Sequence, residues 1–262
     1  MKAAPFDYVR ATALSDVFAA FERHGDDARI VAGGQSLMPM MNMRLAAPQV
    51  LVDINHIAEL GGISEADGAL RIGALTRHKD LIADALVAQH APLLKMAASH
   101  IAHPAIRNRG TFGGSLSHAD PAAELPACAI ASGALINVAS SGGERSIKAI
   151  DFFLGTFDTA MEPGEILVSV DIPMMGKNER VAFAELARRQ GDYALVGLAA
   201  KGIIDGGIFS NLRLVFFSVA DRPVMATATI AALEGREYSP NTVKAAEAAL
   251  EADLQDIDSD LH

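Results

Sequence analysis

The hydrophobic positions in the first third of the chain fall into short runs separated by polar, Gly or Pro positions. Runs of this kind that are rich in Val, Ile and Leu are typical of β-strands. The pattern therefore predicts short strands at residues 29–31, 50–54 and 69–72.

Three longer stretches have apolar residues at helical spacing. Residues 76–87 are predicted to form one helix that starts at Thr76 as its N-cap. Its inner face would hold Leu81, Ile82, Ala85 and Leu86. Residues 92–100 are predicted to form a second helix, because Pro92 suits a first helical turn. Residues 122–131 are mostly small and apolar, so we expect a helix that packs tightly on its neighbours.

The second half of the chain has the composition of strands joined by tight turns. A hairpin is predicted over residues 135–147, and a further strand over residues 166–172, which Pro173 ends. The segment 174–179 is the best candidate for a domain boundary, because a new pattern follows it. Beyond it we predict antiparallel strands at 181–186, 199–205 and 211–219, a turn at 205–207, and helices near 226–233 and 242–254. The whole pattern predicts an α+β protein with domains at residues 1–175 and 176–262.

Composition narrows the class of protein. Half of the 262 residues are hydrophobic, but charge, Gly or Pro breaks every apolar stretch before it could span a membrane. The net charge of −10 argues against nucleic acid as a partner. The first ten residues lack the basic and apolar blocks of a secretory signal, so we expect a cytoplasmic protein. Cys128 is the only cysteine, so this chain holds neither a disulfide nor a cysteine-ligated iron–sulfur cluster, and we expect it to be a buried apolar residue.

Two glycine-rich segments carry the strongest chemical signal. They are Ala32-Gly33-Gly34-Gln35-Ser36 and Gly110-Thr111-Phe112-Gly113-Gly114-Ser115. Each offers consecutive backbone N–H groups with little side-chain bulk, which a diphosphate needs at close range. We therefore expect the two segments to hold a dinucleotide from both sides. Three arginines are candidate cations for its phosphates: Arg44, Arg107 and Arg109.

The simpler interpretation of each glycine segment is a tight turn, with Ser36 only capping the helix that follows. Neither segment matches a Rossmann fingerprint, a P-loop or the nucleophile elbow of a hydrolase. The eight histidines form no motif of the H-E-x-x-H kind, so no metal site is predicted on this chain.

Between and beyond these segments the chain resembles the FAD-binding medium subunits of molybdenum hydroxylases, of the carbon monoxide dehydrogenase and xanthine dehydrogenase type. The resemblance rests on motifs in the family's order and spacing. They are Val31 to Leu37 with Asn42-Met43-Arg44, Ile72 to Thr76, Arg107 to Ser115 with Asp120 to Glu124, Arg188 to Ala194, and Val219 to Pro223. Phe112 stands where the family usually has Ile.

The resemblance implies an FAD-binding domain of the PCMH/vanillyl-alcohol-oxidase type, with two α/β subdomains at about residues 1–57 and 58–175. A small C-terminal α+β domain with an antiparallel sheet would follow. It implies that FAD is held by Ala32, Gly33, Gly34, Gln35 and Ser36 and by Thr111, Phe112, Gly113, Gly114 and Ser115. Glu124 matches an acidic position near the FAD ribose, and Tyr193 an aromatic position near the isoalloxazine ring. Tyr193 would then gate the flavin, and no catalytic residue is expected on this chain.

The resemblance also implies a role in electron transfer. Electrons from a molybdenum cofactor on a large subunit would pass through two [2Fe-2S] clusters on a small subunit to the FAD of this chain, and then to an external acceptor. The complex would be a dimer of heterotrimers in the cytoplasm. Two alternatives stay open: a stand-alone FAD oxidase of the vanillyl-alcohol-oxidase type, and a nonenzymatic module that binds a phosphorylated metabolite. The substrate of the complex and its acceptor are not encoded in these motifs.

Overall fold

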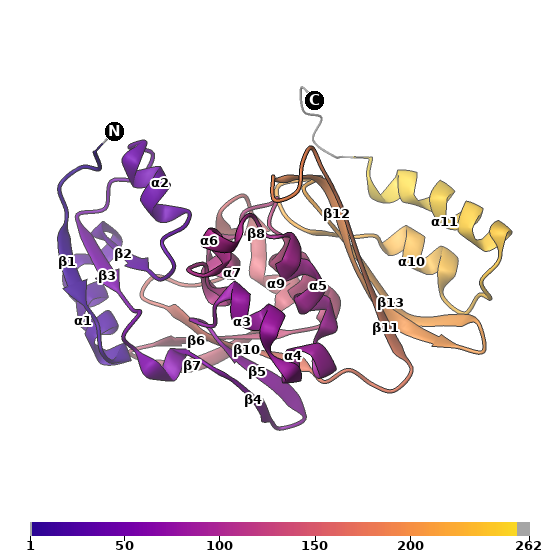
Figure 1. Cartoon of the computed structure of the whole chain (residues 1–262), viewed down its shortest axis with the longest axis horizontal. Helices are drawn as coiled ribbons and strands as arrows, with labels where there is room; N and C mark the ends of the chain where they lie inside the picture. The colour runs from indigo at the N-terminus through magenta and orange to yellow at the C-terminus, as the bar shows by residue number, and fades with distance from the viewer. Residues whose placement is uncertain (1, 256–262) are drawn as a thin grey trace.

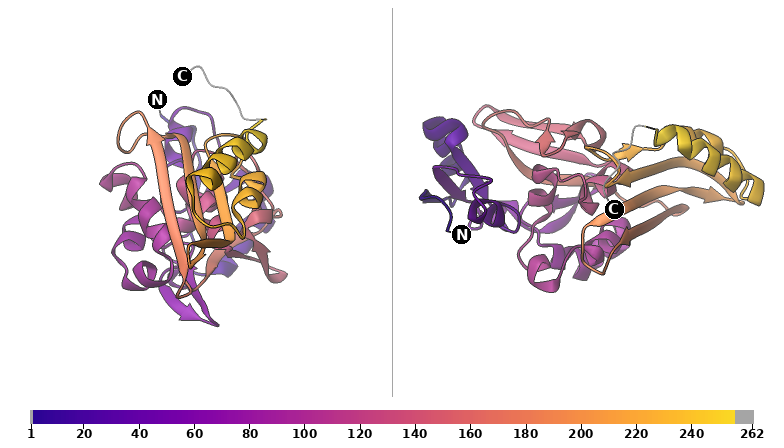
Figure 2. Two further views of the ribbon diagram at one scale, coloured as in Figure 1. Left: turned by 90° about the vertical axis from the view of Figure 1, so that its right-hand side faces the viewer. Right: turned by 90° about the horizontal axis from the view of Figure 1, so that it is seen from above.

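The computed structural model describes residues 2–255, and it consists of three units in a row along the long axis of the molecule (Figure 1). A three-stranded sheet lies at one end, a five-stranded sheet in the middle, and a four-stranded sheet at the other end, as the view from above shows (Figure 2). The protein is therefore a mixed α and β structure that contains antiparallel sheets, as predicted.

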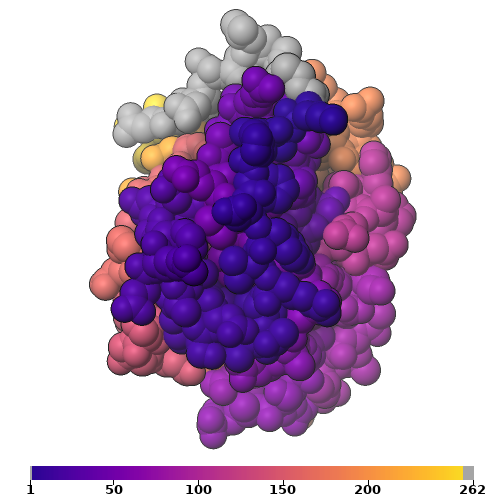
Figure 3. Space-filling model, turned by 90° about the vertical axis from the view of Figure 1, so that its left-hand side faces the viewer, coloured from indigo at the N-terminus to yellow at the C-terminus, as the bar shows by residue number. Residues whose placement is uncertain are grey.

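The N-terminal unit is a parallel sheet in the order β1-β3-β2. Its strands are β1 (Asp7–Arg10), β2 (Ala28–Val31) and β3 (Val50–Asp53). Helix α1 (Leu14–His24) and the short turn η1 (Gly25–Asp27) connect β1 to β2, and α2 (Leu37–Asn42) follows β2. The predicted strands β2 and β3 are confirmed. This unit forms one end face of the molecule, where its indigo residues lie together (Figure 3).

The middle unit is an antiparallel sheet in the order β4-β5-β10-β6-β7. Its strands are β4 (Ile63–Ala66), β5 (Ala69–Gly73), β10 (Ile166–Pro173), β6 (Leu135–Ser140) and β7 (Gly143–Lys148). Its other elements are η2 (Ala58–Leu60), α3 (His78–Ala83), α4 (Ala85–His90), α5 (Pro92–His100), α6 (Pro104–Arg107), α7 (Phe112–His118), α8 (Glu124–Ser132), α9 (Ala149–Phe152), β8 (Phe153–Gly155) and β9 (Asp158–Thr159). The predicted hairpin, the strand at 166–172 and the helix at 92–100 are confirmed.

The prediction of one helix over residues 76–87 is wrong. Asp84 interrupts it with an extended backbone, and its carboxylate accepts hydrogen bonds from the N–H groups of Leu86 and Val87 at 2.8 and 3.1 Å. This cap starts α4 as a separate helix, because a short carboxylate competes well for free N–H groups. Thr76 is not an N-cap; its hydroxyl donates to the Gly62 carbonyl at 3.1 Å. Ala85 lies exposed rather than on an inner face.

Helix α8 is buried on all sides, as its small apolar residues predicted. It packs against α5 on one side and against the C-terminal strands on another, so it joins the cores of two units. Cys128 within it is fully buried, and burial raises the pKa of its thiol. The apolar character of α8 is thus explained by packing, and within residues 2–255 no helix has the length and hydrophobicity to cross a membrane.

The C-terminal unit is an antiparallel sheet in the order β11-β12-β13-β14, with two helices packed beside it (Figure 2). Its elements are β11 (Glu179–Ala187), β12 (Ala194–Asp205), β13 (Ile208–Phe217), β14 (Val224–Met225), α10 (Thr227–Leu233) and α11 (Pro240–Asp253). The turn at 205–207 is confirmed, and Gly206 and Gly207 have the positive φ that it needs. Strand β12 begins five residues earlier than predicted, at Ala194 rather than 199, and β13 ends at Phe217.

One cross-strand pair in this sheet gives a stability prediction. Gly197 on β12 lies opposite Phe217 on β13, and the buried Phe217 ring covers the glycine. A Cβ at Gly197 would lie 2.6 Å from Cε2 of that ring. We expect Gly197→Ala to lower the free energy of unfolding by about 1–3 kcal/mol in urea titrations, because the core is overpacked. Gly142→Ala is the control, since its Cβ would meet only Ser140 Oγ at 3.6 Å. Equal stability of the two variants would contradict the packing argument.

Candidate functional site

A cleft of about 720 Å³ lies where the N-terminal unit, the middle unit and the loop before β12 meet. Both glycine-rich segments line it, together with residues from the start of α8 and the loop at 191–193. The predicted site residues that line the cleft are Ala32, Gly33, Gly34, Gln35, Ser36, Thr111, Gly113, Gly114, Ser115, Glu124 and Tyr193. The structure therefore brings together residues from widely separated parts of the sequence.

Phe112 is the one predicted site residue that does not line the cleft. Its side chain is fully buried in the core of the middle unit, and its N–H donates to the Thr76 carbonyl at 2.9 Å. Phe112 thus anchors the second glycine segment from beneath.

The first glycine segment offers free backbone donors. Within the described chain, none of the N–H groups of residues 33–37 donates to a protein acceptor. Gly34 has a φ of +70°, and Ser36 is in the right-handed helical region at the start of α2. Unpaired N–H groups in a turn of this kind can bind an anion, and we call those of residues 33–37 the N–H nest. The Ser36 side chain does not cap α2, which leaves its hydroxyl free to bind a ligand.

The second segment is built differently from our expectation. Its N–H groups are already used: Phe112 and Gly113 donate to the carbonyls of Thr76 and Ala74 at 2.9 Å, and Ser115 donates to Thr111 at 3.0 Å. The Thr111 side chain accepts from Gly114 N–H at 3.2 Å and caps α7. The expectation of a second row of free N–H groups is therefore wrong, because these residues form the first turn of a helix. This segment lines the cleft with two glycines and with the hydroxyl-bearing residues Thr111 and Ser115.

Glycine is required where the two segments touch. A Cβ at Gly33 would press against the Arg109 carbonyl and lie 2.9 Å from Gly110 Cα. Gly113 meets Ala74 as closely, with 2.6 Å from its Cβ position to that of Ala74. The Gly33 contact lets the two segments approach to van der Waals distance, whereas the Gly113 contact holds the second segment against residue 74 of the middle unit.

The three candidate arginines do not reach the cleft. Arg107 donates to the carbonyls of Ile101 and Ala102 at 2.7 and 2.8 Å, and neither Arg44 nor Arg109 lines the cleft wall. The cleft lining gives no support to the expectation that these cations meet a phosphate. The Arg107 side chain donates to the backbone instead, and the N–H nest is left as the anion-binding feature.

Glu124 faces the cleft from the first turn of α8. Burial raises the pKa of its carboxyl to about 8, and the nearby carboxylates of Glu185 and Asp120 act in the same direction. The group is therefore mostly protonated at neutral pH, and a protonated carboxyl both donates and accepts hydrogen bonds.

Tyr193 stands at the rim of the cleft with 70% of its surface exposed. Across the cleft lining, His118 stacks on Phe157 with ring centroids 4.7 Å apart. Together these rings supply flat surfaces on which a planar ligand can stack.

Sequence reasoning missed His78, which lines the cleft beneath the second segment and is buried. Its Nε2 is 3.0 Å from the Thr111 carbonyl, and burial lowers its pKa to about 4, so the ring is neutral. Its local sequence gives no signal for this role, because its partner lies thirty-three positions away.

Comparison with known proteins identifies the two halves of the chain. Residues 4–175 match the family model described as the FAD binding domain in molybdopterin dehydrogenase. Residues 181–262 match the model described as the CO dehydrogenase flavoprotein C-terminal domain. Residues 256–262 of that match lie outside the part that the structure describes.

Individual relatives agree with these matches. The chain is 44% identical over 205 residues to the 6-hydroxypseudooxynicotine dehydrogenase complex subunit alpha of Paenarthrobacter nicotinovorans, covering 78% of this chain and 69% of that one. It is similar in structure to carbon monoxide dehydrogenase from Hydrogenophaga pseudoflava, with a TM-score of 0.96, 38% identity, and coverage of 100% and 91%. Quinoline 2-oxidoreductase from Pseudomonas putida 86 gives a TM-score of 0.92 at 39% identity, with coverage of 100% and 90%. The chain belongs to the family of FAD-binding medium subunits of molybdenum hydroxylases, which are subunits of oxidoreductases.

Proposed function

We propose that this chain carries FAD between an iron–sulfur partner and an external electron acceptor in a molybdenum hydroxylase. The observation that supports this most is the nest of unused N–H groups at residues 33–37, in a segment that lines the same cleft as Thr111 and Ser115 of the second segment. An acidic protein can hold a diphosphate in this way, since each charge-assisted hydrogen bond contributes about 1.5–3 kcal/mol. Bound FAD supplies the redox chemistry, taking up electrons singly and releasing them in pairs.

Different residues would bind different parts of FAD. The N–H groups of residues 33–37 and the Ser36 hydroxyl would bind the diphosphate, and the hydroxyls of Thr111 and Ser115 would donate to it from the other side. Gly33 and Gly113 let these loops pack closely, because their Cβ positions point at the Arg109 carbonyl and at Ala74. Glu124 would hydrogen-bond a ribose hydroxyl through its protonated carboxyl. Tyr193 would cover the flavin ring at the rim and control access of the acceptor.

The partner assignments extend this proposal. Relatives of this chain are named as a subunit of a dehydrogenase complex or as a medium chain. We propose a small partner with two [2Fe-2S] clusters, a large partner with the molybdenum cofactor, and assembly as a dimer of heterotrimers. The lone, fully buried Cys128 supports clusters on another chain. The substrate class would be set by the large subunit. The cytoplasmic location stays a prediction.

We also propose functional domain boundaries at residues 1–175 and 176–262, with the first domain divided at about residue 57. The boundary near residue 175 falls in the segment between β10, which ends at Pro173, and β11, which begins at Glu179. The division near residue 57 falls between β3, which ends at Asp53, and β4, which begins at Ile63.

The phosphate role of the first segment is tested with Gly34→Ala. Its φ of +70° is essential to the nest, so the variant should bind FAD about tenfold more weakly or worse. Gly68→Ala is the matched control, because Gly68 has a φ of +77° and open space around it. FAD affinity is read from the flavin absorption and fluorescence of the purified chain during titration. Gly113 is a poorer test site, since its Cβ would clash with Ala74. A parent chain that binds no flavin, or equal FAD affinity in both variants, would contradict the proposal.

The role of Tyr193 is tested with Tyr193→Ala. Because this side chain is mostly exposed at the rim, its loss should change FAD content little but alter the rate of reoxidation of the reduced flavin several-fold. The control is Tyr238→Ala, which removes an equally exposed tyrosine outside the cleft lining. Stopped-flow reoxidation at unchanged rate would remove Tyr193 from the flavin site.

Glu124 predicts a dependence of stability on pH in the FAD-free chain. Its folded pKa of about 8 lies above the ordinary value of 4.5, so the folded state retains a proton that the unfolded state has released. Stability from this group is complete below pH 4.5 and is lost as the pH rises through 8. As the pH rises from 5 to 9, the free energy of unfolding of Glu124→Gln should therefore increase relative to that of the parent by roughly 1 kcal/mol or more, as one pKa unit is worth about 1.4 kcal/mol. Urea unfolding at each pH measures this difference. Parallel pH profiles for variant and parent would show that Glu124 ionises normally.

A further inference from the structure

A polar network joins the two glycine segments from outside the cleft. It starts at Asn55, just beyond β3, whose Nδ2 donates to the Ala32 carbonyl at 2.8 Å and to Asp53 Oδ1 at 2.6 Å. The Asn55 N–H also donates to Asp53 Oδ1, at 2.9 Å. These bonds fix the orientation of the amide, because both acceptors face Nδ2 and leave Oδ1 pointing away.

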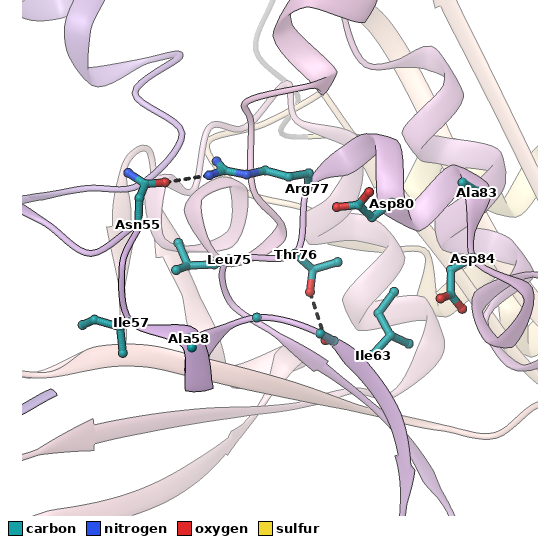
Figure 4. A pocket seen from close by; sticks show the side chains of 12 residues that line it. Asn55, Ile57, Ala58, Ile63, Leu75, Thr76, Arg77, Asp80, Ala83 and Asp84 are labelled. Atoms are coloured by element: carbon teal, nitrogen blue, oxygen red, sulfur yellow. Dashed lines mark hydrogen bonds between the residues drawn. The ribbon is translucent and has the colours of Figure 1, made fainter. Parts of the chain in front are cut away.

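Arg77 completes the link to the second segment. Its Nη2 donates to Asn55 Oδ1 at 2.7 Å, a bond visible in Figure 4, and its Nη1 donates to the Arg109 carbonyl. Among the ion pairs of residues 2–255, none involves Arg77. The guanidinium is partly buried, and burial is the main cause that lowers its pKa. Its two amino groups are thus held by two neutral acceptors: the amide of Asn55, which binds the first segment at Ala32, and the carbonyl of Arg109, which directly precedes the second segment.

This network is the hydrogen-bonded connection between the two walls. In the described part of the chain, no backbone hydrogen bond joins residues 32–37 to residues 109–115. The Arg109 carbonyl that Arg77 binds is also the atom against which Gly33 packs. The guanidinium therefore acts at the point where the segments touch.

Asn55 and Arg77 lie outside the cleft lining. They line a separate cavity of about 640 Å³ with Thr76, Leu75 and Asp80, and neither is part of the cleft wall (Figure 4). None of the residues of either glycine segment lines this second cavity. The two side chains act on the cleft only through the carbonyls that they bind.

We propose that Asn55 and Arg77 form a clamp that sets the spacing of the two glycine segments and so positions them on the FAD diphosphate. The proposal rests on the proposed function of those segments. Asn55 and Arg77 are positioning residues: removal of either leaves every cleft-lining side chain in place but frees one wall to move relative to the other.

The clamp is tested by FAD titration of the flavin-free full-length chain, with Arg77→Ala, Asn55→Ala and the double variant. Each single variant should bind FAD about tenfold more weakly, since one charge-assisted hydrogen bond is lost from a site that needs both walls. The double variant should bind FAD as tightly as the single variant with the lower FAD affinity. The losses should not add, because both substitutions break the same hydrogen-bonded network. The control is Arg71→Ala, which removes a bidentate Arg71–Asp171 pair in the same unit with N–O distances of 2.7 and 2.8 Å.

Chemical rescue separates positioning from general loss of structure. Because the second cavity opens beside Arg77, millimolar guanidinium should enter the space left in Arg77→Ala and restore FAD affinity, while neutral urea at the same concentration should not. Asn55→Asp keeps an acceptor for Arg77 and loses the donor to Ala32, so it should stay weak with guanidinium present. It also serves as the test if Arg77→Ala fails to fold.

The outcomes distinguish this proposal from the one on which it rests. If Gly34→Ala loses FAD while Arg77→Ala and Asn55→Asp bind as the parent does, the clamp is wrong and the phosphate role of the first segment stands. Additive losses in the double variant, or affinity losses as large in Arg71→Ala, would also overturn the clamp. If neither Gly34→Ala nor the clamp variants alter FAD binding, the assignment of the segments themselves is wrong.

Discussion

The structure depends on a contact between two backbones that have no side chain between them. Gly33 lies against the Arg109 carbonyl and Gly110 Cα, and any Cβ would force the segments apart. This contact fixes where the N-terminal unit meets the middle unit. Both walls of the cleft are therefore placed by the same close approach, and the lining residues take their positions from it.

The backbone N–H groups of the two walls explain how an acidic chain can accommodate an anionic cofactor. The first wall leaves its N–H groups at residues 33–37 without protein acceptors, whereas the second wall spends its N–H groups on holding α7 to residues 74–76. The first wall therefore supplies N–H donors, and the second wall supplies a rigid surface that carries the hydroxyl groups of Thr111 and Ser115. The arginines support this division, because Arg77 and Arg107 donate to backbone carbonyls and stabilise the loops rather than a phosphate.

Helix α8 connects the cleft to the C-terminal unit. Its buried residues pack between α5 and the strands β12 and β13, and its first residue, Glu124, faces the cleft. The C-terminal unit adds Tyr193 at the rim through the loop that enters β12. Gly191 in that loop has a φ of +79°, and its Cβ position is 2.7 Å from the Ala102 carbonyl, so this loop also sits close on the middle unit. Family membership agrees with this arrangement, since both domains of the medium subunits match the chain in order.

The sequence by itself determined the class of fold, most strands and helices, the two glycine segments and their family, because these depend on local spacing and short motifs. It did not reveal that Asp84 divides a helix, since a cap and a solvated helical Asp have the same local pattern. It placed N–H donors equally on both segments, but which N–H groups are free depends on acceptors such as the carbonyls of Ala74 and Thr76. The roles of Asn55, Arg77 and His78 are likewise decided by tertiary structure alone. Each of them binds a carbonyl more than twenty positions away, and no local pattern records such a partner.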